Sequence, residues 1–220
     1  MSETVKPDLR AARTAATEER ILAAARTLFL RDGYVATTLT SVADEAGLGH
    51  RTIYVRFGSK AALLKRVIDV AVAGDTRMID VPNRDWFQTA LNAPTLAERL
   101  DALAIGTSDL MARAGDLFGV ALQAEPIEPV IADAYQAGRD ATRDHLRGVV
   151  AKMATDGLID ARVDVGWLGD TVAVMFHPDT YVLVSRTMRW DLSQYRTWLH
   201  ETASVLVQGA NNNGRPRRRH

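Results

Sequence analysis

Apolar side chains recur every three or four residues along almost the whole chain, and this spacing limits the fold more than any other feature. Between residues 17 and 31 they lie on one face of a helix, with Thr17 placed to cap its start and Gly33 placed to end it in a left-handed turn. We find no run of alternating apolar and polar residues bounded by hairpin signals. The sequence therefore predicts an all-α protein.

Capping residues and prolines divide the chain into further helices. Thr38 can cap a short second helix that Gly47 ends, a third spans about residues 50–56, and Ser59 can cap a longer fourth. Prolines punctuate the rest, and His177-Pro178 is interpreted as a helix stop. The predicted stretches are 84–92, 95–113, 115–124, 129–156, 164–177 and 193–208.

A net charge of zero hides an uneven distribution. The 27 basic and 27 acidic residues argue against a protein whose whole surface binds nucleic acid. Residues 1–70 carry 11 Lys and Arg against 8 Asp and Glu, so 11 − 8 = +3, whereas residues 71–214 carry 12 against 19, so 12 − 19 = −7. Such asymmetry is typical of a small DNA-binding module joined to a different domain, although chance also produces it.

Several kinds of chemistry are absent from the sequence. Without cysteine there are no disulfides, thiolate zinc sites or cysteine nucleophiles, and the histidines lack metal-ligand spacing. There is no nucleophile elbow, P-loop or dinucleotide fingerprint. No apolar run reaches the length of a signal peptide or membrane span. We therefore expect a cytoplasmic protein with no enzymatic activity, no metal, no cofactor and no membrane partner.

Two short helices joined by a turn that contains Gly47 form a helix-turn-helix pattern. A recognition helix lies in the major groove with its N-terminal residues toward the bases, so the candidate base readers are His50, Arg51 and Thr52. The candidates for contacts to the phosphate backbone are Thr38, Tyr54, Arg56 and Lys60.

Simpler roles remain open for some of these residues. Thr38 is at minimum a helix cap, and Tyr54 could be a core aromatic with its hydroxyl at the surface. Arg51 and Arg56 could be solvated charges. The motif alone does not decide between these alternatives.

Residues 33–64, GYVATTLTSVADEAGLGHRTIYVRFGSKAALL, closely resemble the DNA-binding signature of the tetracycline-repressor (TetR) family. The positions that carry the resemblance are Thr37-Thr38, Ala46-Gly47, Thr52-Ile53-Tyr54, Phe57 and Ser59-Lys60. Gly49 departs from the Ser or Thr that commonly caps the recognition helix, and His50-Arg51 departs from a common Lys-Gly. These departures leave the operator preference unpredicted.

The resemblance implies an N-terminal three-helix DNA-binding domain and a C-terminal helical bundle. It implies a homodimeric regulator, most often a repressor, that binds a palindromic operator in double-stranded DNA and is released by a small apolar or amphipathic effector. Together with the composition of the two termini, which predicts a flexible basic arm at 1–16 and a disordered basic tail at 209–220, it places the helix-turn-helix domain at 17–64 and a ligand-binding and dimerisation domain at 65–208. The alternative is a nucleoid-associated or constitutive DNA-binding protein without ligand control.

The resemblance also implies roles within the C-terminal domain. The helices near 164–177 and 193–208 would pair with their copies in the dimer, through Val165, Leu168, Val172, Met175, Trp198, Leu199, Thr202, Val205 and Leu206, unless these residues face their own core. The candidate effector-binding residues are Trp86, Phe87, Phe118, Leu122, Trp167 and Phe176.

Overall fold

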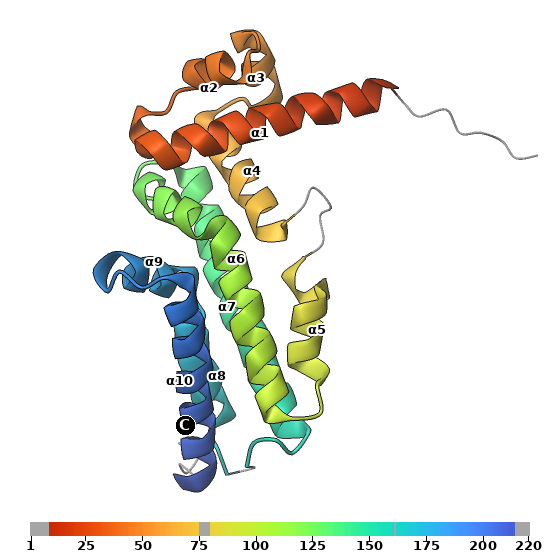
Figure 1. Ribbon diagram of the computed structural model, residues 1–220, viewed down its shortest axis with the longest axis vertical. Coiled ribbons are helices and arrows are strands. Elements are labelled where there is room, and N and C mark those ends of the chain that lie inside the picture. Colours follow the sequence, from red (N-terminus) through yellow and green to blue (C-terminus); the bar gives the residue numbers. More distant parts are fainter. Residues whose placement is uncertain (1–8, 75–79, 161, 214–220) are drawn as a thin grey trace, which may run out of the picture. The chain divides into compact units, whose positions relative to one another are not determined.

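The computed structural model describes residues 9–74, 80–160 and 162–213, and within these ranges all regular structure is helical (Figure 1). The all-α prediction is confirmed. None of the described helices is both long and apolar enough to cross a membrane. The elements are α1 (Leu9–Ala36), α2 (Leu39–Ala46), α3 (His50–Phe57), α4 (Lys60–Ala73), the 3-10 helix η1 (Val81–Asn83), α5 (Asp85–Asn92), α6 (Leu96–Ala124), α7 (Pro129–Thr155), α8 (Val165–Met175), α9 (Pro178–Thr187) and α10 (Leu192–Asn213).

The chain divides into two compact units. Unit 1 comprises the residues up to Asp69 together with Val120–Ala132, and unit 2 comprises Val70–Gly119 and the residues from Asp133 onward. The divisions fall inside α4, α6 and α7, so each of these helices has residues in both units. The turn between α6 and α7 is therefore part of the N-terminal unit, although it lies far from α1 to α4 in sequence.

Unit 1 is built on the apolar face of α1, which packs on α2, while α2 packs on α3. All four N-terminal helices contribute fully buried side chains, among them Ile21, Ala25, Phe29, Val42, Ala43, Ile53, Leu63 and Leu64. The helix begins at Leu9, inside the predicted arm, and not at Thr17. The hydroxyl of Thr17 donates to the Arg13 carbonyl (2.8 Å), one turn back along the same helix, so Thr17 caps nothing. Residues 1–8 of the predicted arm lie outside the described residues.

Gly33 interrupts the helical backbone of α1 with φ 78° and ψ 179°. A side chain is strained at this backbone conformation, which only glycine adopts readily. A Cβ here would also lie 2.8 Å from Oε1 of Gln123. The sequence predicted that the helix ends at Gly33 in a left-handed cap. Helical structure instead resumes after Gly33 and continues to Ala36, and a ψ of 179° is not that of a left-handed cap.

The α6 helix corrects the prediction of two helices at 95–113 and 115–124. Gly115 does not break it. Instead, Gly115 makes room for the Tyr181 ring of α9 because it has no side chain. A Cβ at this position would lie 2.2 Å from Cε1 of Tyr181. The α9 helix itself was not predicted. His177-Pro178 ends one helix and starts the next, because His177 is the N-cap of α9 and Pro178 occupies its first turn.

In unit 2, α8 and α10 lie alongside each other (Figure 1). Leu168, Val172, Met175 and Leu199 are buried within this one chain, so they belong to its own core and are not free to form an interface. The α10 helix continues to Asn213, past the predicted end at residue 208. Residues 214–220 of the predicted tail lie outside the described residues.

Candidate nucleic-acid interface

The α2 helix, which leads into the turn before α3, is capped at both ends. At its start Thr38 is the N-cap, as predicted: its hydroxyl accepts from Ser41 N (3.0 Å), and the Ser41 hydroxyl accepts from Thr38 N (3.0 Å). At its end Gly47 adopts the left-handed conformation (φ 62°, ψ 41°). The Arg20 guanidinium donates to the Ala46 carbonyl (2.6 Å), which fixes this end to α1. The turn that sets the orientation of α3 is thus held by both the Gly47 backbone and the bond from Arg20.

The α3 helix buries one side chain and exposes most of the others. Ile53 is fully buried, whereas Tyr54 is 65% exposed and Val55 is 74% exposed. His50, Arg51 and Thr52, in the first turn of the helix, are also exposed. Tyr54 is therefore not a core aromatic. The exposed face presents the predicted base readers and a tyrosine hydroxyl together.

Arg56 has a partner that the sequence did not predict. Its guanidinium and that of Arg66 both donate to the carboxylate of Glu18, so a single acid on α1 links α3 to α4. The hydrogen bond from Arg56 lowers the pKa of Glu18, burial opposes this shift, and the bond from Arg66 lowers the pKa further. This geometry favours a role for Arg56 in positioning α3, while its contact with phosphate stays a prediction.

We expect Glu18→Gln to destabilise the protein by on the order of 1 kcal/mol near neutral pH, because the two charge-assisted hydrogen bonds become weaker. The folded pKa of Glu18 lies below its ordinary value of 4.5, so its contribution is full above that value and is lost as the pH falls toward the folded pKa. Urea unfolding at a series of pH values should give variant and wild-type curves that converge in acid. A constant gap across this pH range would contradict the assignment.

Lys60 also has intramolecular partners. Its ammonium group donates to the carbonyls of Tyr34 (2.7 Å) and Val35 (3.3 Å) and lies 4.2 Å from the centre of the Tyr34 ring. Burial lowers the pKa of Lys60, and the charge of Glu128 partly opposes that shift. These contacts hold the carbonyl end of α1, and a phosphate contact by Lys60 stays a prediction.

Tyr34 joins the α6–α7 turn to the rest of unit 1. Its side chain is 1% exposed, and its hydroxyl donates to Glu128 (2.7 Å) while its backbone N–H donates to the Gln123 side chain (3.1 Å). Burial, followed by the hydrogen bond to Glu128, raises the pKa of the Tyr34 hydroxyl. The hydroxyl therefore remains a neutral donor, and the turn is fixed by two hydrogen bonds that short-range sequence patterns do not reveal.

The six predicted effector-binding residues have different surroundings. Trp86 packs against Gly106, and Phe87, which is buried, contacts Trp86 and the His145 ring edge to face. Phe118 is buried and contacts Tyr135. The other three differ in environment: Leu122 belongs to unit 1, Trp167 is 43% exposed, and Phe176 is buried.

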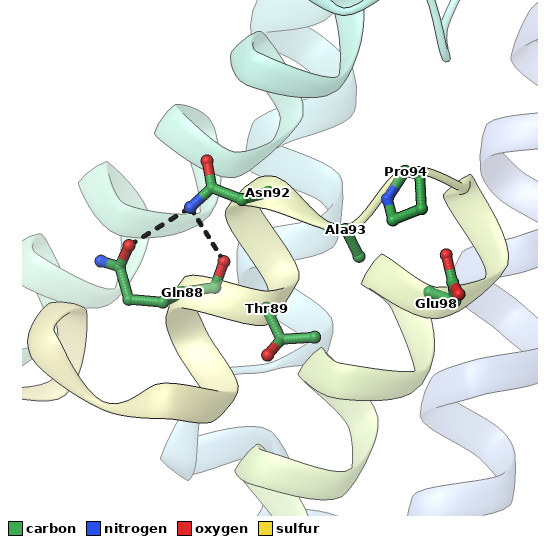
Figure 2. Close-up of a pocket in the computed structure, with 6 residues that line it drawn as sticks. All are labelled: Gln88, Thr89, Asn92, Ala93, Pro94 and Glu98. Carbon is green, nitrogen blue, oxygen red and sulfur yellow. Dashed lines mark hydrogen bonds between the residues drawn. The ribbon is translucent and has the colours of Figure 1, made fainter.

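An open hollow on unit 2 is lined by other residues, Gln88, Thr89, Asn92, Ala93, Pro94 and Glu98 (Figure 2). The Asn92 amide donates to the Gln88 carbonyl (3.0 Å) and to the Gln88 side-chain oxygen (3.2 Å), one turn back along α5. None of the predicted effector-binding residues lines this hollow.

Comparison with known proteins identifies the N-terminal part of the chain. Residues 21–67 match the model of the family described as bacterial regulatory proteins, tetR family. The uncharacterized HTH-type transcriptional regulator YfiR of Bacillus subtilis (strain 168) is 32% identical over 63 residues, which are 29% of this chain and 31% of that protein. The chain thus matches less than a third of the length of this curated relative.

Two solved structures share the fold over nearly their whole length. A TetR transcription regulator from Haloarcula marismortui ATCC 43049 has a TM-score of 0.67 and 16% identity, with 89% of this chain and 98% of that chain covered. The transcriptional regulator FadR from Bacillus subtilis, in complex with stearoyl-CoA, has a TM-score of 0.63 and 16% identity, with 87% and 98% covered. Residues 21–67 are therefore similar to the bacterial regulatory proteins of the tetR family, and the chain has the all-helical fold of the transcriptional regulators with which it was compared.

Proposed function

We propose that the protein is a homodimeric, ligand-responsive transcriptional repressor of the cytoplasm that binds an inverted-repeat operator through α3. The observation that carries this proposal is the exposed face of α3, which is fixed by the buried Ile53 and presents Arg51 and Tyr54. A short helix with exposed polar residues at its N-terminal end is suited to the major groove.

The residues of the face divide into two roles. His50, Arg51 and Thr52 would read bases, and the Arg51 guanidinium can donate two hydrogen bonds to guanine. Tyr54, together with the backbone N–H groups at the start of α2 after Thr38, would contact phosphates. Arg56 and Lys60 would act chiefly by holding α3 and the end of α1 in place, because both have intramolecular partners.

The proposed dimer uses apolar side chains of α8 and α10 that are partly or largely exposed in the single chain. Trp167 and Val174 lie two turns apart on α8 and are 43% and 67% exposed, and Val205 on α10 is 69% exposed. Because α8 and α10 lie alongside each other, they can present these apolar side chains to a second copy. A two-fold dimer would place two recognition helices about 34 to 36 Å apart on one side of the DNA.

The proposed effector is apolar or amphipathic and binds within unit 2, where Trp86, Phe87, Phe118 and Phe176 contribute aromatic surface. FadR, whose structure holds stearoyl-CoA, supports this ligand class through its similar fold. A signal would travel along the helices that have residues in both units, α4, α6 and α7. Coupling of about 1 to 3 kcal/mol would weaken DNA binding about 5- to 150-fold.

We expect Arg51→Ala to reduce affinity for the operator by about 1 to 3 kcal/mol and to relax base preference at one position of each half-site. Tyr54→Phe is the matched comparison, because it removes a hydroxyl that contacts phosphate and should lower affinity for all sequences alike. Selection from a random DNA library, followed by titration of selected and scrambled duplexes, measures both effects.

The same selection tests the proposed function itself. Enrichment of an inverted repeat supports a dimeric operator-binding regulator. Binding without an enriched sequence would instead indicate a nucleoid-associated protein. Equal losses for Arg51→Ala on selected and scrambled DNA would assign Arg51 to the phosphate backbone.

A further inference from the structure

The first side chain of the recognition helix is paired with an acid on the preceding helix. Nε2 of His50 lies 3.0 Å from Oδ1 of Asp44, and the two side chains are 59% and 68% exposed. The pair spans the turn between α2 and α3. Asp44 was not among the residues that sequence reasoning singled out.

This contact determines which edge of the imidazole remains available. A carboxylate can only accept a hydrogen bond, so the Nε2 that faces Asp44 carries the proton. In a neutral imidazole the other nitrogen, Nδ1, is then an acceptor. With Nε2 turned toward α2, the group that His50 offers to a partner is an acceptor, and the nearby carboxylate adds negative charge to the same surface.

The turn itself does not depend on the pair. Gly47 in its left-handed conformation and the bond from Arg20 to the Ala46 carbonyl already fix the end of α2. A hydrogen bond between two side chains as exposed as these contributes little to stability. The main consequence of the contact is therefore the orientation of His50.

We propose that Asp44 determines base specificity by orienting His50, so that His50 selects a base bearing an exocyclic amine, cytosine or adenine, and disfavours guanine. This inference rests on the proposed function, in which His50 faces the major groove. There, cytosine N4 and adenine N6 are donors that an imidazole acceptor can bind, whereas guanine presents only the acceptors O6 and N7. Opposite guanine, the lone pairs of His50 Nδ1 and of the Asp44 carboxylate would face those of O6 and N7, and the contact would be repulsive.

The test is selection from a random DNA library with the full-length protein and three variants, His50→Ala, Asp44→Ala and Glu45→Ala. His50→Ala identifies the half-site position that His50 reads. At that position the wild type should enrich cytosine or adenine over guanine about 5-fold or more, and Asp44→Ala should lose most of this preference because the imidazole is free to turn its Nε2–H toward the DNA. Thermal unfolding followed by circular dichroism should show that the variants fold like the wild type.

Glu45→Ala is the matched control for charge. It removes one negative charge from an exposed neighbour of Asp44 on the same helix, so any general gain in DNA affinity should appear in both variants. Only Asp44→Ala should change the base frequencies. Unchanged frequencies with Asp44→Ala, or the same change with Glu45→Ala, would overturn the inference while leaving the regulator function intact. Failure of the wild type to enrich any sequence would overturn both.

Discussion

Replacing Val174 and Val205 together with glutamate is expected to weaken operator binding by about 10²- to 10⁴-fold, the range that linking two binding modules provides. Both side chains are largely exposed on the single chain, at 67% and 69%, on helices that lie alongside each other. In a two-fold dimer the same patch would meet its own copy, so each substitution would bring unpaired carboxylates into a desolvated contact. The resulting monomer would bind one half-site without the help of a second recognition helix.

Two measurements separate assembly from DNA recognition. Sedimentation should show a dimer for the wild type and a monomer for the double variant, while affinity for a single half-site should be the same for both. Ile105→Glu is the matched control, since it places the same charge on a 44% exposed apolar position of α6, outside the proposed interface. A double variant that sediments as a dimer and binds the operator normally would contradict this assignment of the interface.

Local features of the DNA-binding unit could be predicted from sequence because their causes lie within a few residues. The Thr38 cap bonds to Ser41, three residues away, and Gly47 ends α2 through its own backbone conformation. Such interactions need no knowledge of the rest of the chain.

The partners of the charged residues could not be predicted in this way. Glu18 lies 38 residues from Arg56, and Lys60 lies 26 residues from the Tyr34 carbonyl that it contacts. No spacing rule connects such positions, because the contacts exist only after α1, α3 and α4 have packed. Arg56 and Lys60 therefore looked like free cations suited to phosphate, whereas the folded chain uses both internally.

The two faces of α8 show a second reason why sequence patterns could not predict all of the structure. Trp167, Leu168, Val172 and Val174 are apolar, yet Leu168 and Val172 are buried within the chain while Trp167 and Val174 are exposed. A helix that is apolar on all sides has no periodic signal to distinguish its own core from an interface. The predicted interface stripe was therefore wrong at Leu168, Val172 and Met175, although the helix itself was predicted.

Gly33→Ala is expected to lower the free energy of unfolding by about 1 to 3 kcal/mol, because alanine is strained at a φ of 78° with a ψ of 179°. The new Cβ would also displace the Gln123 side chain from its bond to Tyr34 N and loosen the α6–α7 turn. Gly148→Ala is the control of opposite sign: it lies in α7 with open space around it and should stabilise by about 0.5 to 1 kcal/mol. Urea unfolding gives both values, and hydrogen exchange should show faster opening of α1 and residues 120–132 only in Gly33→Ala. Equal stabilisation by the two substitutions would show that the bend at Gly33 is not a required feature of unit 1.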